Sequence, residues 1–214
     1  MITAIFDLDG TLADTICDLG DAVNYGLQQL GCPAHDYESY KKMVGNGAKK
    51  LCERALPEGK KDKTMELHGL FKEYYSKHYL DKTRLYDGMQ ETLQKLQGRG
   101  VVLAVATNKP ESAAREIVDV LLPDIDFIKV LGGVDCRPHK PDTEIIDVIL
   151  AALPDEENCI YMIGDSNVDI QTAKNAGIRS IGCSWGFRGR AELENEGADY
   201  IAEKPEDIIN VILK

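Results

Sequence analysis

The first residues that could do chemistry stand in the sequence DLDGT, directly after an apolar run at residues 2–6. Asp7 and Asp9 are one residue apart, so on an extended segment both carboxylates point to the same side of the chain. Gly10 and Thr11 follow, and they predict a turn that presents backbone N–H groups beside the acids. One carboxylate of such a pair can attack an electrophile while the other transfers a proton. The residue types alone do not decide which carboxylate has which role.

Other polar residues follow later apolar runs in the same way. They are Thr107, Asn108 and Lys109 after residues 101–106, and Gly164, Asp165, Ser166 and Asp169 after residues 159–163. Lys140, in the sequence RPHKPD, stands between the run at 127–131 and the next helical pattern. In an open parallel sheet, ligands bind beyond the carboxyl ends of the strands. These residues are therefore expected to converge on one edge of a sheet.

The charges at this sheet edge predict a metal ion. Four carboxylates, those of Asp7, Asp9, Asp165 and Asp169, face a single lysine, Lys140. Like charges about 4 Å apart repel by about 4 kcal/mol at an effective dielectric constant of about 20. A hard divalent cation relieves this repulsion, and Mg²⁺ takes few protein carboxylates while leaving positions for water and phosphate. Together with Lys140, the Thr107 hydroxyl and the backbone N–H groups of the turn, such a cation would bind a phosphoryl group.

The elements that would position these residues alternate along the outer parts of the chain. Short apolar runs without polar alternation predict strands at residues 2–6, 101–106, 127–131, 159–163, 178–183 and 200–202. Apolar residues at helical spacing lie between these runs, as at Ile145, Ile149 and Leu153. Strands buried on both faces with helices between them indicate an α/β fold with a doubly wound, parallel, Rossmann-like sheet.

Residues 15–82 interrupt this alternation and predict a small helical domain, here called the helical insert. Apolar helical faces recur around residues 19–30, 48–55 and 67–75, which predicts three helices. Tyr74, Tyr75 and Tyr79 share the third face and are expected to pack rather than to bind a ligand. The sequence Gly45-Asn46-Gly47 marks a turn between helices. Residues 1–14 and 83–214 would then form the catalytic core, with hinges near residues 13–15 and 82–86.

Composition excludes several classes of partner. The chain has 214 residues, of which 43% are hydrophobic and 29% charged, with a formal net charge of −11. We therefore expect a globular protein that binds neither nucleic acid nor a membrane surface. The six cysteines include no CxxC pair, and no apolar run approaches 18 residues. Because a strand is predicted to begin at Ile2, we expect no signal peptide and hence a cytoplasmic protein. We separately expect a monomer or a weak homodimer.

Taken together, DLDGT, Thr107, Lys140 and the sequence GDSNVD at residues 164–169 resemble the four ordered motifs of the haloacid dehalogenase superfamily of phosphatases. The helical insert resembles the small mobile cap of that family. The resemblance implies that Asp7 is the nucleophile and Asp9 the general acid and base. It also implies the following ligands: Asp7, the Asp9 backbone carbonyl and Asp165 for Mg²⁺, Asp169 as a further or outer partner of the metal, and Thr107 and Lys140 for the phosphoryl oxygens.

Shorter segments resemble the phosphoglycolate phosphatase branch of that family. They are GNGAKKL at Gly45, YDGMQETL at Tyr86, ATNKP at Ala106 and SWGFRGRAELENEGADYI at Ser184. In that branch the glycine-flanked turn of the cap approaches the substrate. The resemblance therefore implies substrate contacts from Gly45, Asn46 and Gly47, besides those from Gly10, Thr11, Asn108 and Lys109. Two positions depart from the branch: Asp87 replaces a usual proline, and His139 precedes Lys140.

The leading functional hypothesis is a Mg²⁺-dependent phosphomonoesterase that forms an aspartyl phosphate. Its substrate would be a small phosphorylated metabolite, with 2-phosphoglycolate as the first candidate. A β-phosphoglucomutase-like sugar phosphomutase and an inorganic pyrophosphatase are alternatives on the same residues. A phospho-relay receiver-like domain is the non-enzyme alternative, although its phosphorylated acid lies in the middle of the chain. A dehalogenase is disfavoured because Asp9 supplies a proton-transfer group that this chemistry lacks.

Overall fold

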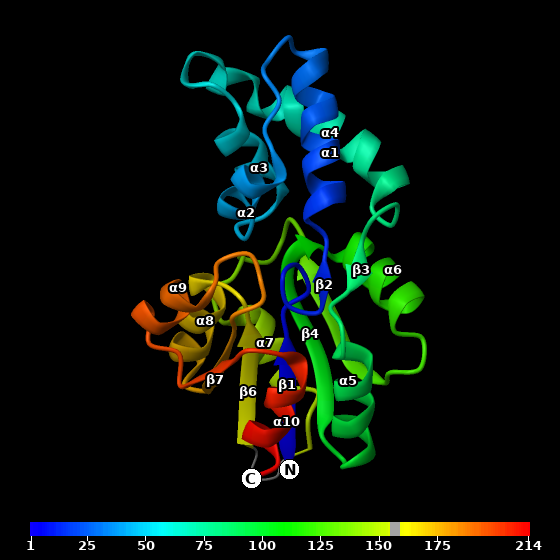
Figure 1. Ribbon diagram of the computed structural model, residues 1–214, viewed down its shortest axis with the longest axis vertical. Helices are drawn as coiled ribbons and strands as arrows, with labels where there is room; N and C mark the ends of the chain where they lie inside the picture. Colours follow the sequence, from blue (N-terminus) through cyan, green and yellow to red (C-terminus); the bar gives the residue numbers. More distant parts are fainter. Residues whose placement is uncertain (155–158) are drawn as a thin grey trace.

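The computed structural model describes residues 1–154 and 159–214, and its centre is a six-stranded parallel sheet (Figure 1). The strands lie in the order β5, β4, β1, β6, β7, β8. Their bounds are Ile2–Phe6 (β1), Val102–Pro110 (β4), Phe127–Gly133 (β5), Cys159–Gly164 (β6), Arg179–Cys183 (β7) and Tyr200–Ala202 (β8). β1 pairs with β4 on one side and β6 on the other, so the DLDGT sequence at its end lies near the middle of the sheet. The predicted α/β fold class is confirmed.

Helices cover both faces of the sheet. Successive side chains of β1 point to opposite faces, and both sets are buried. Ala4 and Phe6 belong to one hydrophobic cluster and Ile5 to another, and all three are fully buried. The first cluster includes residues of α5 (Met89–Gly98), α6 (Glu111–Leu121) and α10 (Pro205–Ile212). The second includes residues of α7 (Glu144–Leu150) and α8 (Asn167–Ala176), while the short α9 (Arg190–Asn195) packs beside β7. This is the doubly wound arrangement that the sequence predicts.

β4 is longer than its apolar run predicts. The run ends at residue 106, but the strand continues to Pro110, which pairs with Gly133 of β5 after a shift in register. The strand therefore ends with three buried polar residues, Thr107, Asn108 and Lys109. A strand predicted from its apolar residues ends too early here. The polar residues that continue β4 are stabilised by partners in other segments of the chain, which the local sequence does not reveal.

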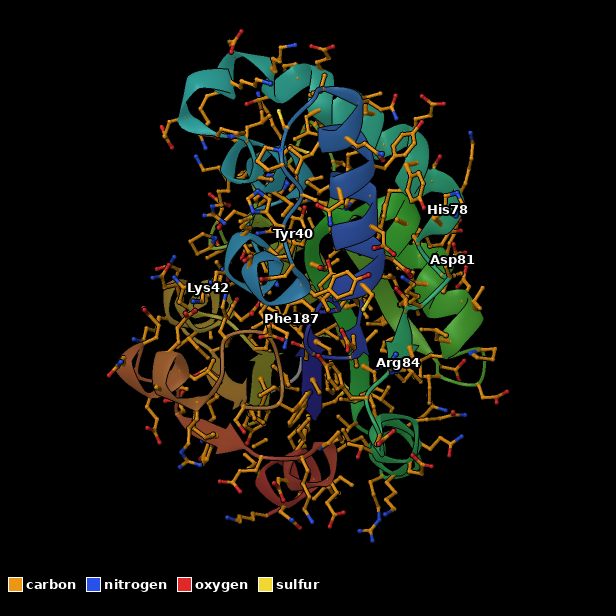
Figure 2. The ribbon with its side chains drawn as sticks, turned by 45° about the horizontal axis from the view of Figure 1, so that its top comes forward. Tyr40, Lys42, His78, Asp81, Arg84 and Phe187 are labelled. Atoms are coloured by element: carbon orange, nitrogen blue, oxygen red, sulfur yellow. The ribbon has the colours of Figure 1, made fainter. Side chains whose placement is uncertain are left out.

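The helical insert has a hydrophobic cluster of its own. It contains α1 (Ile16–Gln29), α2 (Tyr37–Met43), α3 (Ala48–Ala55), a 3₁₀ helix (Glu58–Lys63) and α4 (Thr64–His78). α1, α3 and α4 match the three predicted helices. α2 was not predicted, because Tyr40 is its one buried residue and gives no periodic apolar signal. Figure 2 shows Tyr40 among these helices, and Phe187 at the place where the loop after β7 packs against them.

Two short strands join the helical insert to the sheet. β2 (Ala13–Asp14) pairs with β3 (Arg84–Leu85) in an antiparallel manner, so the outgoing and returning chains run side by side. Asp18, at the start of α1, is 2% exposed and accepts hydrogen bonds from the N–H groups of Lys82 and Thr83 and from the Thr83 hydroxyl. These bonds fasten the first helix of the insert to the returning chain. No helix in the described part of the chain has the length and apolarity needed to cross a membrane.

Candidate active site

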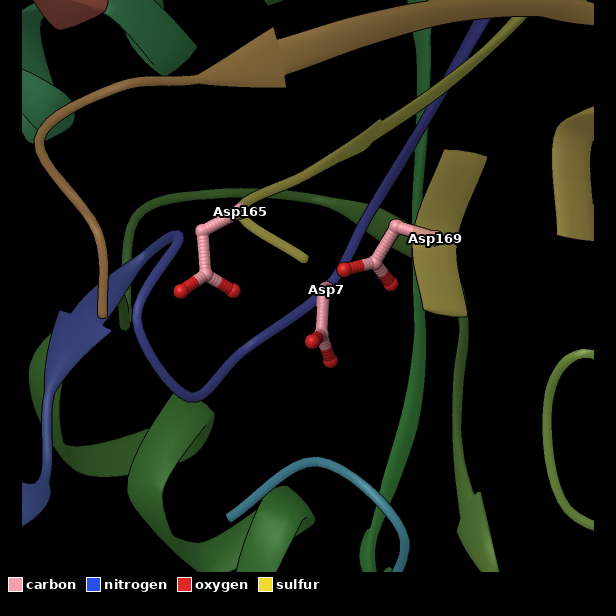
Figure 3. A group of neighbouring side chains, drawn as sticks. All are labelled: Asp7, Asp165 and Asp169. Carbon is pink, nitrogen blue, oxygen red and sulfur yellow. The ribbon is translucent and has the colours of Figure 1, made fainter. Parts of the chain in front are cut away.

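Three carboxylates meet at the sheet edge (Figure 3). Asp7 follows β1, Asp165 follows β6, and Asp169 lies in the first turn of α8. One carboxylate oxygen of each residue lies within 4.8 Å of the other two, and none of the three residues is more than 8% exposed. The structure thus brings together three of the four acids that strand spacing selects. The fourth, Asp9, belongs to a separate ion pair at the same edge.

Burial and the repulsion of neighbouring acids raise the pKa values of Asp7 and Asp165. Burial is the main cause for Asp7, with a further increase from Asp169, and together they outweigh Lys140 and the Thr107 hydroxyl and raise the pKa of Asp7 to about 6. The pKa of Asp165 lies well above its usual range because of burial, then because of Asp169 and Asp7. The excess of buried negative charge and the all-oxygen donor set fit a hard divalent cation such as Mg²⁺.

Asp169 and Lys140 form a buried ion pair behind Asp7. The Lys140 Nζ lies 2.6 Å from Asp169 Oδ1 and 3.2 Å from Asp7 Oδ1. The other oxygen of Asp169 accepts hydrogen bonds from the backbone N–H and the hydroxyl of Ser166. Burial lowers the pKa of Lys140, but the two acids raise it by more, so the ammonium remains charged. Asp169 therefore uses both oxygens to orient Lys140 and to close the first turn of α8.

Asp165 is held by the loop that follows β7. Its Oδ2 accepts a hydrogen bond of 2.6 Å from the Phe187 N–H. The approach of the loop is close: a Cβ at Gly186 would stand 2.2 Å from the Asp165 Cβ, and one at Gly10 would stand 2.4 Å from its Oδ2. Two glycines are thus required around this carboxylate. The same loop reaches the helical insert, where the Phe187 side chain packs and Arg188 donates a hydrogen bond of 2.8 Å to the Val44 carbonyl.

Asp9 forms an ion pair with the buried side chain of Lys109. Its Oδ1 accepts hydrogen bonds from Lys109 Nζ at 2.8 Å and from the Thr15 hydroxyl at 2.7 Å. Burial lowers the pKa of Lys109, but Asp9 and Tyr75 raise it by more, to above its usual value. The carboxylate is therefore fixed on one oxygen, at the boundary between the sheet edge and the helical insert.

The Asn108 side chain links Lys140 to the helical insert. Its Oδ1 accepts from the Lys140 N–H at 2.8 Å, and its Nδ2 donates to the carbonyls of Lys140 at 3.0 Å and Gly45 at 2.9 Å. Both amide hydrogens are used in these bonds, so a substrate can reach Asn108 only through its backbone. Asn108 thus holds the peptide units on both sides of the Lys140 side chain and fastens the turn at Gly45.

A cavity of 40 Å³ separates the sheet edge from the helical insert. The residues that line it from the sheet side are Asp7, Asp9, Thr107, Asn108, Lys109, Pro110, Asp165 and Ser166. From the helical insert, Leu19, Val44, Gly45, Gly47, Ala48, Leu51, Phe71 and Tyr75 line it. Phe187 and Arg188 complete the wall. The cavity therefore has a charged floor and an almost wholly apolar roof.

Several residues selected from the sequence lie elsewhere. The Asn46 side chain does not line the cavity, because its Oδ1 accepts a hydrogen bond from Arg54. The Thr11 hydroxyl is buried behind the turn and has no hydrogen-bond partner among the described residues. His139 lies against the turn of the insert, where a Cβ at Gly47 would stand 3.0 Å from its Nε2. Asp87 is exposed in the turn before α5 and does not line the cavity.

Other lining residues were not selected from the sequence. Tyr75 was expected to pack, yet it lines the cavity beside Lys109. Its place in an apolar helical stripe gave no signal of this, because core and cavity lie on the same face of α4. Arg188 follows the SWGF segment, and only its position in a segment that resembles a phosphatase branch could have drawn attention to it.

Comparison with known proteins identifies the family. Residues 4–183 match the haloacid dehalogenase-like hydrolase family. A protein of Vibrio parahaemolyticus named phosphoglycolate phosphatase is 32% identical over 97% of this chain and 94% of its own length. A phosphoglycolate phosphatase of Pseudomonas savastanoi is 34% identical over 98% of this chain and 76% of its own.

The solved structures agree with this match. A haloacid dehalogenase-like family hydrolase of Streptococcus pneumoniae superposes with a TM-score of 0.86 and 30% identity, over 98% of each chain. The resemblance inferred from the sequence, including that to the phosphoglycolate phosphatase branch, is confirmed. The chain is an enzyme and belongs to the haloacid dehalogenase-like hydrolase family.

Proposed function

We propose that this hydrolase is a Mg²⁺-dependent phosphatase that forms a phosphoaspartate on Asp7 and acts on 2-phosphoglycolate. The names of its relatives support the substrate, since both curated relatives described above are phosphoglycolate phosphatases. The observation that carries the proposal is the cavity, which places Asp7, Asp9 and Thr107 on the floor of a space too small for a large substrate.

Asp7 and Asp165 are the side chains that would hold Mg²⁺, together with the backbone carbonyl of Asp9. Both carboxylates are buried, and burial is the main cause of their raised pKa values. Asp169 would not bind Mg²⁺ directly but would support the site indirectly, because its two oxygens already accept hydrogen bonds from Lys140 and Ser166. When bound, Mg²⁺ would neutralise charge on the phosphoryl oxygens.

The proposed chemistry assigns a separate task to each acid of the DLDGT sequence. Asp7 would attack phosphorus, while Lys140 and the Thr107 hydroxyl bind the phosphoryl oxygens and reduce their charge. Asp9 would protonate the leaving oxygen and then take a proton from the water that hydrolyses the phosphoaspartate. Its Oδ1 is fixed by Lys109 and Thr15, so Oδ2 would carry the proton.

The volume of the cavity favours a small leaving group. A volume of 40 Å³ holds about three water molecules. It is far below the roughly 300 to 1,000 Å³ of pockets that enclose drug-sized ligands. Any phosphate ester would therefore require the helical insert to move, and a hexose or a nucleoside would require a larger movement than a two-carbon leaving group. The cavity therefore disfavours the sugar phosphomutase alternative.

The two parts of the chain would act as a core and a cap. We assign residues 1–14 and 83–214 to the core and residues 15–82 to the cap, with β2 and β3 as the connection. Asn108 and Arg188 hold the cap against the core through the carbonyls of Gly45 and Val44. Opening would break these bonds and admit substrate, and closing would exclude bulk water during the reaction.

Phosphate release tests the proposal. The assay compares 2-phosphoglycolate, hexose phosphates, nucleoside monophosphates and pyrophosphate, with Mg²⁺ and with excess chelator. We expect 2-phosphoglycolate to have the highest kcat/KM and chelator to abolish turnover. Full activity in chelator would contradict the metal assignment, and a higher kcat/KM for a hexose phosphate or pyrophosphate would contradict the substrate assignment.

A further inference from the structure

The Tyr75 hydroxyl is a buried polar group with no partner at hydrogen-bond distance among the described residues. Tyr75 lies on α4, is 4% exposed and lines the cavity. The Lys109 ammonium interacts with this hydroxyl but does not form a hydrogen bond of normal length with it. Burial raises the pKa of Tyr75 to about 12, so the hydroxyl keeps its proton at neutral pH and can donate a hydrogen bond. Buried polar groups nearly always have partners, so an unpaired hydroxyl in a ligand cavity indicates a bond that forms with the ligand.

Lys109 brings a positive charge to the same place. Its Nζ lies 4.9 Å from the centre of the Tyr75 ring, and its side chain is 1% exposed. The Asp9 carboxylate, 2.8 Å away, accepts one of the three hydrogens of the ammonium group. The other donors of the ammonium group are not bonded to Asp9, and they lie near the Tyr75 side chain in a part of the cavity shielded from water, where hydrogen bonds to an anion are strong.

The surroundings make this pair distinctive. Among the described residues that the helical insert contributes to the cavity wall, Tyr75 has the one polar side chain. The rest of the roof, including Leu51 and Phe71, is apolar and cannot solvate an anion. The phosphoryl site lies on the floor at Asp7 and Thr107. A second anionic group on a small substrate would therefore meet its donors at Tyr75 and Lys109.

We propose that the Tyr75 hydroxyl and the Lys109 ammonium bind a carboxylate on the leaving group, and that Tyr75 is a specificity-determining residue for substrates that carry one. This inference rests on the proposed phosphatase function and adds the part of the site that distinguishes one leaving group from another. It accounts for the unpaired hydroxyl and for a lysine that is buried at the boundary between core and insert.

Arg188 is the competing candidate for this carboxylate, because it also lines the cavity and a guanidinium binds carboxylates well. Part of its guanidinium is engaged elsewhere. One nitrogen donates to the Val44 carbonyl at 2.8 Å, and Nε lies 3.9 Å from Glu192. Arg188 thus holds the insert against the sheet edge, while its remaining donors keep it the alternative that the experiment below must distinguish from Tyr75.

The experiment compares two phosphate esters that differ in one group. 2-Phosphoglycolate and ethyl phosphate have two-carbon leaving groups, but only the first has a carboxylate. We expect wild-type enzyme to prefer 2-phosphoglycolate. Tyr75→Phe should lower kcat/KM for 2-phosphoglycolate by about 10- to 100-fold, as expected for a lost hydrogen bond to a charged group, and leave ethyl phosphate unchanged. Phenylalanine keeps the ring beside Phe71, so the fold should survive.

Tyr40→Phe is the matched control. Tyr40 is a fully buried tyrosine of the same insert, but its hydroxyl donates to Asn24 and it does not line the cavity. Its loss should leave the ratio of the two kcat/KM values unchanged. As a second measurement, Tyr75→Phe should weaken inhibition by glycolate but not by inorganic phosphate, because phosphate binds only the floor.

Each other outcome has a distinct meaning. If wild-type enzyme cleaves neither ester, the proposed function fails and this inference fails with it. If both esters are cleaved equally well, or if Tyr75→Phe slows both equally or neither, the phosphatase assignment stands and the carboxylate site is overturned. It is also overturned if Arg188→Gln removes the preference for 2-phosphoglycolate while Tyr75→Phe retains it.

Discussion

The floor and the roof of the cavity are built on different principles. On the floor, Asp7 and Lys109 are buried and Asp9 is partly buried, and all three ionisable side chains form hydrogen bonds. On the roof, Leu51 and Phe71 are apolar, and the one polar group, the Tyr75 hydroxyl, has no partner among the described residues. A floor of fixed, ionisable groups suits a reaction that is the same for every phosphate ester. A roof with one unpaired donor suits selection among leaving groups.

Asp9→Asn tests the proton-transfer group of the floor and should have a larger effect on turnover than the substitutions of Asn108 and Leu51 described below. Asparagine is nearly the same size and its oxygen can still accept from Lys109 and Thr15, but it cannot transfer a proton. Turnover should fall by about 10² to 10⁴, as expected for loss of a general acid and base. Steady-state phosphate release measures the effect.

Asp14→Asn is the control for Asp9→Asn, because Asp14 lies in the same connection but accepts its hydrogen bond from the Ile16 N–H outside the cavity. It should leave the rate unchanged. An Asp9→Asn enzyme that turns over as fast as wild type would remove Asp9 from the mechanism.

Asn108→Ala tests whether floor and roof are coupled. The change removes both bonds to the Lys140 backbone and the bond to Gly45. We expect kcat/KM to fall by about 10- to 100-fold because Lys140 is no longer held in place. The free energy of unfolding should fall by about 1–3 kcal/mol, because buried backbone groups lose their partner.

Asn175→Ala is the matched control for Asn108→Ala. Asn175 donates to the carbonyl of Pro141, next to Lys140, but it is on the surface and touches neither Lys140 nor the helical insert. Its removal should leave both activity and stability nearly unchanged. Equal effects of the two substitutions would show that Asn108 has no special part in positioning Lys140.

Leu51→Ala separates selectivity from chemistry. Leu51 lines the roof and is 2% exposed, so its truncation enlarges the cavity without touching the floor. The kcat/KM for glycerol 3-phosphate relative to 2-phosphoglycolate should rise by about 10-fold, since a few methylene groups in an apolar pocket change discrimination by that amount. Stability should fall by about 2–5 kcal/mol.

Leu27→Ala should reproduce the stability loss of Leu51→Ala without the change in selectivity. Leu27 is fully buried in the hydrophobic cluster of the insert but does not line the cavity. If Leu27→Ala shifts the substrate preference equally, the roof does not select substrate through its shape.

The same contrast between floor and roof explains which residues of the cavity could be predicted from the sequence. Residues at strand ends are predictable, because apolar runs place Asp7 after β1 and Asp165 after β6, and parallel strands bring these ends together. Thr107 and Lys109 line the cavity although β4 extends through them, since their order along the chain is unaffected by the bounds of the strand.

The roof could not be predicted in the same way. Tyr75 shares its helical face with core residues, and only the packing of α4 against Lys109 shows that part of this face borders a cavity. Asn46 belongs to the right turn, but its side chain points to Arg54, which spacing cannot reveal. Strand topology thus fixes the floor, whereas side-chain packing between separate elements determines the roof.

The most direct test of phosphoryl transfer through Asp7 is to trap the phosphoenzyme. Enzyme mixed with Mg²⁺ and 2-phosphoglycolate is quenched rapidly in acid, digested and examined by mass spectrometry. The proposed mechanism predicts one added phosphoryl group on the peptide that contains Asp7. It also predicts that this species is absent from Asp7→Asn enzyme, which should also be inactive. Phosphate release by Asp7→Asn enzyme, or a phosphoryl group on any other residue, would contradict it.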